Sequence, residues 1–136
     1  MKPNFFIIGA ARSGTSSLDR YLSQHPEIYI TPKKETHFFA HDLIPSNFTG
    51  PGDERLNNSL IRDEKQYAQL FADTTKKVVG ESSAFYLCFP EVAERIAQAV
   101  PDAKIIVILR EPVDRTYSAH TFLSRDGRET LSFEEG

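Results

Sequence analysis

The sequence has very little sulfur and no long apolar run. Its 136 residues include one cysteine, one methionine and no tryptophan. Because a single thiol, Cys88, cannot form an internal disulfide, a disulfide-stapled secreted scaffold is excluded and a cytoplasmic location is expected. The apolar stretch near the start, residues 5–9, is too short for the core of a signal peptide and far too short to span a bilayer. We therefore expect no membrane partner.

The sequence also lacks an excess of charge of either sign. Sixteen Lys and Arg residues stand against 19 Asp and Glu residues, which gives a formal net charge of −3. Such a chain has no global field that attracts nucleic acid, so no nucleic-acid partner is expected and any anionic ligand must be held locally. The composition, with 40% hydrophobic and 26% charged residues, excludes collagen-like, coiled-coil and disordered classes. It predicts one domain over residues 1–136.

Short apolar runs alternate with amphipathic segments, and this alternation predicts an α/β fold with a mainly parallel central sheet. Strands are expected at residues 5–8, 27–31, 78–80 and 104–109, the last being the strongest strand signal. Helices are expected at residues 16–24, 59–72, 90–100 and 113–123. Residues 42–58, rich in Pro, Gly, Asn and Ser, predict a long surface loop.

The junction between the first predicted strand and helix carries a phosphate-loop pattern. Residues 9–16 read Gly-Ala-Ala-Arg-Ser-Gly-Thr-Ser, with glycines five positions apart. Such a loop holds an anion with its backbone amides and with the N-terminus of the following helix. Nucleotide triphosphatases require Lys after the second glycine, where Thr15 stands, so the cation is instead Arg12 inside the loop. The alternative is a turn that uses glycine only for sharp geometry.

A second basic group follows the strongest predicted strand. Arg110 stands at its end and Ser118 comes eight positions later, about two turns into a helix. Because ligands bind at the carboxyl edge of a parallel sheet, Arg110, Ser118 and the first loop are expected at the same edge. Alternatively, Arg110 pairs with Glu111 or Asp114 and Ser118 is merely solvated.

Together these motifs resemble those of the sulfotransferases that use 3'-phosphoadenosine 5'-phosphosulfate (PAPS). The resemblance implies a P-loop-like three-layer α/β sandwich and a sulfuryl transfer to the hydroxyl or amine of an acceptor such as a saccharide. It implies that the donor, and its product 3'-phosphoadenosine 5'-phosphate (PAP), is bound by Arg12, Ser13, Gly14, Thr15, Ser16, Ser17, Arg110 and Ser118. Two basic-plus-hydroxyl groups match the two anionic ends, so no metal is expected.

Two further segments extend this resemblance. Residues 34–39 read Lys-Glu-Thr-His-Phe-Phe and match a Lys-Glu-x-x-Phe-Phe segment of the carbohydrate-type members, and residues 80–86 match their Gly-Glu-containing substrate segment. The resemblance assigns catalysis to Glu35, as the base, and to Arg12, which stabilises charge. It assigns acceptor binding to Glu35, His37, Glu81, Ser82 and Ser83.

The chemistry of the second-strand segment is consistent with a base. Burial of Glu35 beside Phe38 and Phe39 would raise its pKa toward neutrality. The alternative is a surface turn at Lys34 and Glu35 over a small aromatic core. His37 and His41 lie four positions apart, but no third ligand accompanies them, so a metal site is not expected.

The sequence departs from the family pattern at two residues and in its length. Many members have Lys where Arg12 stands, and some glycan-sulfating members have Lys where Ser82 stands, which disfavours heparan-like acceptors. Family members also continue beyond these motifs, so the resemblance implies an N-terminal portion that is truncated at its C-terminus. The alternative functions are a P-loop nucleotide kinase-like enzyme, disfavoured by Thr15, and a non-catalytic nucleotide-binding fragment.

Overall fold

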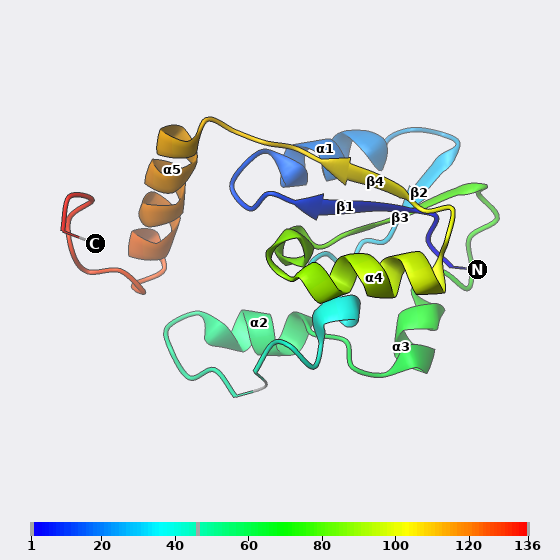
Figure 1. Cartoon of the computed structure of the whole chain (residues 1–136), viewed down its shortest axis with the longest axis horizontal. Helices are drawn as coiled ribbons and strands as arrows, with labels where there is room; N and C mark the ends of the chain where they lie inside the picture. Colours follow the sequence, from blue (N-terminus) through cyan, green and yellow to red (C-terminus); the bar gives the residue numbers. More distant parts are fainter. Residues whose placement is uncertain (1, 46, 136) are drawn as a thin grey trace.

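The computed structural model describes residues 2–45 and 47–135 and has three layers (Figure 1). Met1, Ser46 and Gly136, which belong to the expected domain and loop, lie outside the described residues. The central sheet is made of β1 (Phe5–Gly9), β2 (Ile28–Ile30), β3 (Val78–Ser82) and β4 (Lys104–Val107), in the order β2-β3-β1-β4. All three pairings are parallel, which confirms the predicted α/β class and brings the four carboxyl ends to one edge.

Alternating side chains of β1 build a core on each face of the sheet. Phe5 and Ile7 pack on the face covered by α1 (Thr15–Leu22), whereas Phe6 packs on the face covered by α4 (Pro90–Ala99). Gly80 of β3 lies directly under the ring of Phe5, and a Cβ there would come within 2.0 Å of the ring. A glycine is therefore required at this position for the central strands to pair.

The middle of the chain differs from the prediction. The expected loop at 42–58 gives way to α2 (Asp53–Ser59). The expected single helix at 59–72 is wrong, because beyond the end of α2 only α3 (Glu64–Gln69) is helical there. The break has a clear cause: Ile61 is fully buried and its amide donates to Thr36 O at 2.9 Å. Asp63 then starts a new helix by accepting a hydrogen bond from the Gln66 amide at 2.8 Å.

The last two elements are the most exposed part of the fold. β4 is an edge strand that ends at Val107, two residues earlier than predicted, and Ile105 is 47% exposed. The final helix, α5 (Pro112–Arg125), contains no buried residue and stands away from the sheet in Figure 1. Two short 3-10 turns, η1 (Phe38–Ala40) and η2 (Ala84–Cys88), complete the fold on the α4 side.

Candidate active site

The loop between β1 and α1 has the form of an anion cradle. Gly14 has φ 102° at the start of α1, where no side chain caps the helix, and a Cβ there would meet no atom within 4 Å. The amides of Ser17 and Leu18 both donate to Gly14 O at 3.1 Å, so the amides before them have no acceptor within the helix. The Ser13 hydroxyl is buried and has no hydrogen-bond partner among the described residues. These donors suit a bound anion.

The structure brings Arg12, Arg110 and Ser118 together. The Arg12 Nε atom donates to Ser118 Oγ at 3.2 Å, and Arg110 Nη1 donates to the carbonyl of Arg12 at 3.4 Å. The Arg12 guanidinium also lies 4.7 Å from the centre of the Phe122 ring. Within residues 2–45 and 47–135 Arg110 forms no ion pair, and Glu111 instead caps α5 by accepting from the Asp114 amide at 2.9 Å. The two basic motifs therefore share one edge.

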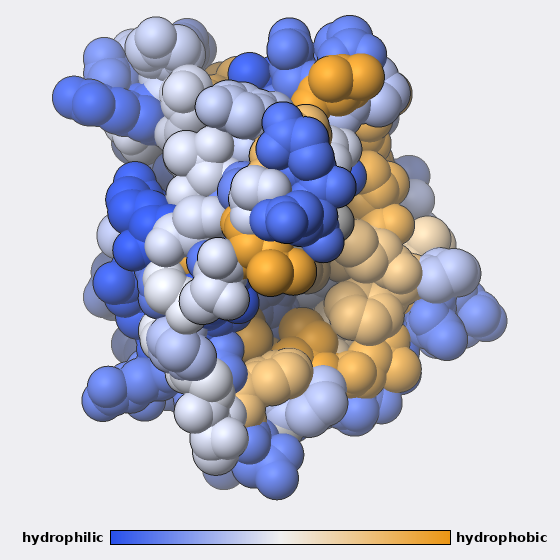
Figure 2. Space-filling view, turned by 90° about the vertical axis from the view of Figure 1, so that its left-hand side faces the viewer, coloured by the Kyte–Doolittle hydropathy of each residue, from blue (hydrophilic) through white to orange (hydrophobic). Residues whose placement is uncertain are grey.

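Seen from this edge, the surface is divided into a polar and an apolar part with a hollow between them (Figure 2). Exposed apolar side chains on the segments that follow β3 and β4 are Phe85, Leu87, Leu109, Val113 and Tyr117. The segments that leave the strand ends thus carry exposed apolar side chains as well as the polar residues of the cradle.

Glu35 lies at the same edge and is held by the backbone of β3 and η2. Its amide donates to Ser82 O at 2.9 Å, and its Oε2 accepts from the Ala84 amide at 2.9 Å. The side chain keeps 30% of its exposure. Burial raises the pKa of this carboxyl from 4.5 to about 7, while the nearby Lys34 ammonium opposes the rise. Such a carboxyl can take a proton near neutral pH.

His37 lies beneath Glu35 and is fully buried. Neither ring nitrogen has a hydrogen-bond partner in the described part of the chain, and Nε2 lies 3.7 Å from Glu35 Oε2. Burial lowers the pKa of His37 to about 4, so the ring is neutral at pH 7. It therefore gives Glu35 a neutral, close neighbour.

Glu81 is fully buried and serves as a four-way hydrogen-bond acceptor. Its Oε1 accepts from the Thr36 hydroxyl and, at 2.8 Å each, from Ser83 Oγ and Tyr86 OH, and its Oε2 accepts from Tyr67 OH at 2.5 Å. Burial beside this carboxylate raises the pKa of both tyrosines. One carboxylate thereby joins β3, the segment after β2, α3 and η2.

The expected acceptor-binding residues thus differ in their exposure to solvent. Glu35 reaches solvent, whereas His37, Glu81, Ser82 and Ser83 are at most 1% exposed. The four buried residues line the underside of the site, and a role for them in acceptor binding stays a prediction.

Sequence reasoning missed several contacts of this site. The Lys34 ammonium donates to Ser16 Oγ at 2.9 Å, Phe122 stacks on Arg12, and Tyr67 binds Glu81. One signal was available: a glutamate at the end of an apolar strand, as in residues 78–81, indicates a buried carboxylate that needs hydroxyl partners. The other two contacts join segments far apart in the sequence.

Residues 2–45 and 47–135 contain no cluster of three or more His, Cys, Asp or Glu side chains that could hold a metal, and metal-free chemistry stays a prediction. No helix in that part of the chain has the length and apolar character needed to cross a bilayer.

Comparison with known proteins gives the family. A crystal structure of a sulfotransferase from Alicyclobacillus acidocaldarius matches with a TM-score of 0.93 and 60% identity, over 99% of this chain and 55% of that chain. The membrane-associated sulfotransferase kil1 of Dictyostelium discoideum is 33% identical over 88% of this chain and 23% of its own length. Carbohydrate sulfotransferase 15 of Rattus norvegicus is 28% identical over 98% of this chain and 29% of its own length.

The chain therefore spans about half of the solved structure's chain and less than a third of these curated relatives. The profile of the sulfotransferase family matches residues 3–135, which is nearly the whole chain. With the motifs, the fold and this match in agreement, the chain belongs to the sulfotransferase family.

Proposed function

We propose that this chain binds PAPS and transfers its sulfuryl group to a hydroxyl or amine of a saccharide. The observation that carries the proposal is the meeting of the two basic motifs, through Arg12 Nε to Ser118 Oγ at 3.2 Å and Arg110 Nη1 to Arg12 O at 3.4 Å. A saccharide acceptor is supported by relatives described as carbohydrate sulfotransferase 15 and as a bifunctional heparan sulfate N-deacetylase/N-sulfotransferase.

The residues at the strand edge fit a donor with two anionic ends. The uncapped N-terminus of α1 and the unpartnered Ser13 hydroxyl suit the 5'-phosphosulfate, and the open space at Gly14 leaves room for it. The hydroxyls of Thr15, Ser16 and Ser17 belong to the same turn. Arg110 and Ser118 suit the 3'-phosphate, because a guanidinium and a hydroxyl together make charge-assisted hydrogen bonds to it.

Glu35 and Arg12 have different roles in the proposed reaction. When bound, the donor supplies a sulfuryl group, whose sulfur–oxygen bond to the 5'-phosphate breaks as the acceptor's oxygen or nitrogen attacks the sulfur, and PAP leaves with the bonding electrons. Glu35 takes the proton of the acceptor. Arg12 and the amides of the cradle stabilise the negative charge that develops on the departing phosphate oxygen. Arg12 has no acid role, because a guanidinium keeps its proton up to a pKa above about 12.

The buried substrate-side residues hold the base in place. His37 lies directly under Glu35, Ser82 O accepts the Glu35 amide, and Ser83 Oγ accepts the His37 amide at 3.2 Å. Glu81 fixes Ser83 through its 2.8 Å hydrogen bond. These contacts orient the Glu35 carboxylate toward the acceptor. The reaction is proposed to proceed in the cytoplasm without a metal, a membrane or nucleic acid.

The test is a pair of calorimetric titrations of the 136-residue chain, one with PAP and one with ATP plus magnesium. The proposal predicts that PAP binds and that ATP does not, because Thr15 replaces the lysine that holds a triphosphate. Arg12→Ala tests that PAP binds at the cradle, and it should lower the affinity for PAP. Binding of ATP alone would support the kinase-like alternative and contradict the proposal.

A further inference from the structure

We infer that Lys34 is a second donor-binding cation, which contacts the sulfuryl group of PAPS from the side of the cradle opposite Arg12. The inference rests on the proposed function and deepens it. Lys34 and Glu35 are neighbours on the segment after β2, so one short segment would carry both the base and this cation.

The Lys34 ammonium is hydrogen-bonded to the cradle. Its Nζ donates to Ser16 Oγ at 2.9 Å, and Ser16 belongs to the first turn of α1, next to the free amides. An ammonium has three N–H donors, so two remain after this bond. Ser16 therefore holds Lys34 within reach of an anion seated on the helix N-terminus.

Arg12 is held on the other side. Its Nε atom is bonded to Ser118, and its guanidinium stacks on Phe122, so the side chain faces α5. This is the side of the cradle where Arg110 lies. Arg12 is thus directed toward the phosphates, and the side that faces Glu35 has Lys34 as its neighbouring cation.

The side facing the acceptor needs such a cation. The carboxyls of Glu35 and Asp19 both lie there, burial raises the pKa of each, and Lys34 lowers the pKa of each. Asp19 Oδ2 is buried and has no hydrogen-bond partner within the described residues. A sulfuryl group that approached two carboxylates without a nearby cation would be repelled, and Lys34 offsets this repulsion. PAP lacks the sulfuryl group, so Lys34 should distinguish donor from product.

The experiment compares PAPS and PAP on Lys34→Met by calorimetry, in the absence of acceptor. We expect the affinity for PAPS to fall about 10-fold, as for loss of one charge-assisted hydrogen bond, and the affinity for PAP to change less than about twofold. Lys34→Arg keeps the charge and should retain most of the PAPS affinity.

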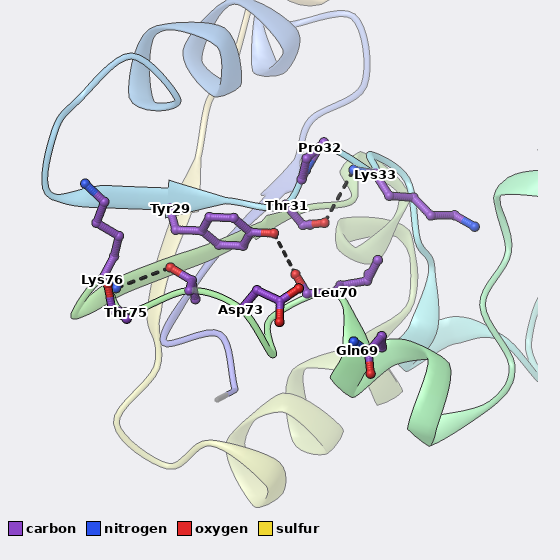
Figure 3. A pocket seen from close by; sticks show the side chains of 10 residues that line it. Tyr29, Thr31, Pro32, Lys33, Gln69, Leu70, Asp73, Thr75 and Lys76 are labelled. Carbon is purple, nitrogen blue, oxygen red and sulfur yellow. Dashed lines mark hydrogen bonds between the residues drawn. The ribbon is translucent and has the colours of Figure 1, made fainter.

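Lys33→Met is the matched control. Lys33 points to the carbonyl of Asn58, with Nζ at 3.5 Å, and lines a separate groove of about 520 Å³ beside Tyr29 at the free edge of β2 (Figure 3). It should leave the affinities for PAPS and PAP unchanged. If Lys33→Met weakens PAPS as much as Lys34→Met does, the effect is general charge and the inference is overturned.

A second readout does not depend on ligand. In Lys34→Met the pKa of Glu35, followed by carboxyl carbon NMR of the free protein, should rise above about 7, because the cation that opposes its burial is gone. An amide spectrum shows whether the variant is folded, and Lys34→Gln, which also removes the charge, takes its place if Lys34→Met is not. Equal losses for PAPS and PAP, or no loss for either, would overturn the inference. If the wild-type chain binds neither nucleotide, the proposed function fails instead.

Discussion

The two sides of the strand edge are built in opposite ways. On the base side, the Glu81 carboxylate is fully buried and accepts four hydroxyl hydrogen bonds that tie β3, α3 and η2 together. On the side of the proposed donor site, α5 contains no buried residue and meets the cradle through one hydrogen bond of 3.2 Å and one stacked ring. Arg110, which precedes α5, adds a contact of 3.4 Å to the Arg12 carbonyl. The proposed base, Glu35, is thus positioned by the folded chain itself, whereas the proposed donor side is held by a few exposed contacts.

This difference separates stability from affinity. Changes that remove Glu81 or its hydroxyl partners on the base side should lower the free energy of unfolding, because they leave buried polar groups without partners. Changes on the proposed donor side should leave the fold intact and lower the affinity for the nucleotide. Each variant below is chosen to break or to sharpen that contrast.

The largest expected effect is that of Glu81→Ala. It leaves the hydroxyls of Thr36, Tyr67 and Tyr86 buried without their acceptor, and we expect a loss of about 3 to 5 kcal/mol in the free energy of unfolding. Urea denaturation measures it. The matched variant on the donor side, Ser118→Ala, should change stability by less than about 0.5 kcal/mol. Similar losses in the two variants would remove the contrast.

Arg110→Ala tests the donor side. We expect it to weaken PAP by about 1.5 to 3 kcal/mol more than it weakens adenosine 5'-phosphosulfate, which has no 3'-phosphate to contact. Calorimetry of both ligands gives the difference. Losses of the same size for the two ligands would show that Arg110 does not hold the 3'-phosphate.

Glu35→Gln tests the raised pKa through the pH dependence of stability. The folded pKa of about 7 lies above the ordinary 4.5, so the wild-type carboxyl contributes stability below pH 4.5 that is lost as the pH rises through 7. The amide does not ionise, so at pH 8 Glu35→Gln should be more stable than wild type by about 2 kcal/mol. Urea denaturation at pH 4.5 and pH 8 measures this. A difference that is the same at both pH values would contradict the assignment.

Phe122→Leu should have the smallest effect. It removes the ring 4.7 Å from the Arg12 guanidinium, and PAP binding should weaken by about 0.5 to 1 kcal/mol with unchanged stability. Leu123→Ala, at an exposed neighbouring position of α5, is the control and should leave PAP affinity unchanged. If the two variants behave alike, the stacked ring does not position Arg12.

The sequence predicted the parts of the fold that depend on local pattern. The apolar run at residues 5–8 became β1, the glycines on either side of Arg12 became the turn into α1, and Pro90 and Pro112 opened α4 and α5. It did not predict the break at Ile61, because the amphipathic pattern of residues 59–72 continues across it. Only contact with the core and the backbone of Thr36 pulls that residue out of a helix.

The main residues of the site were predictable from the sequence, whereas the contacts that hold them in place were not. Arg12, Glu35 and Arg110 carry recognisable spacings, and the parallel sheet brings their segments to one edge. The partners of Glu81 come from three segments, which are the one after β2, α3 and residues 83–86. The contact between Lys34 and Ser16 joins the segments that follow two different strands, so no local pattern encodes these contacts. Packing between segments distant in the sequence determines which polar groups form hydrogen bonds with one another.

The central claim is that Arg12 and Arg110 hold two ends of one nucleotide. It is tested most directly by titrating the chain with PAP, adenosine 5'-phosphate and adenosine 3'-phosphate under the same conditions. The account predicts that PAP binds at least about 100-fold more tightly than either mononucleotide, because both basic groups are engaged at once. PAP that binds no more tightly than the better mononucleotide would contradict it.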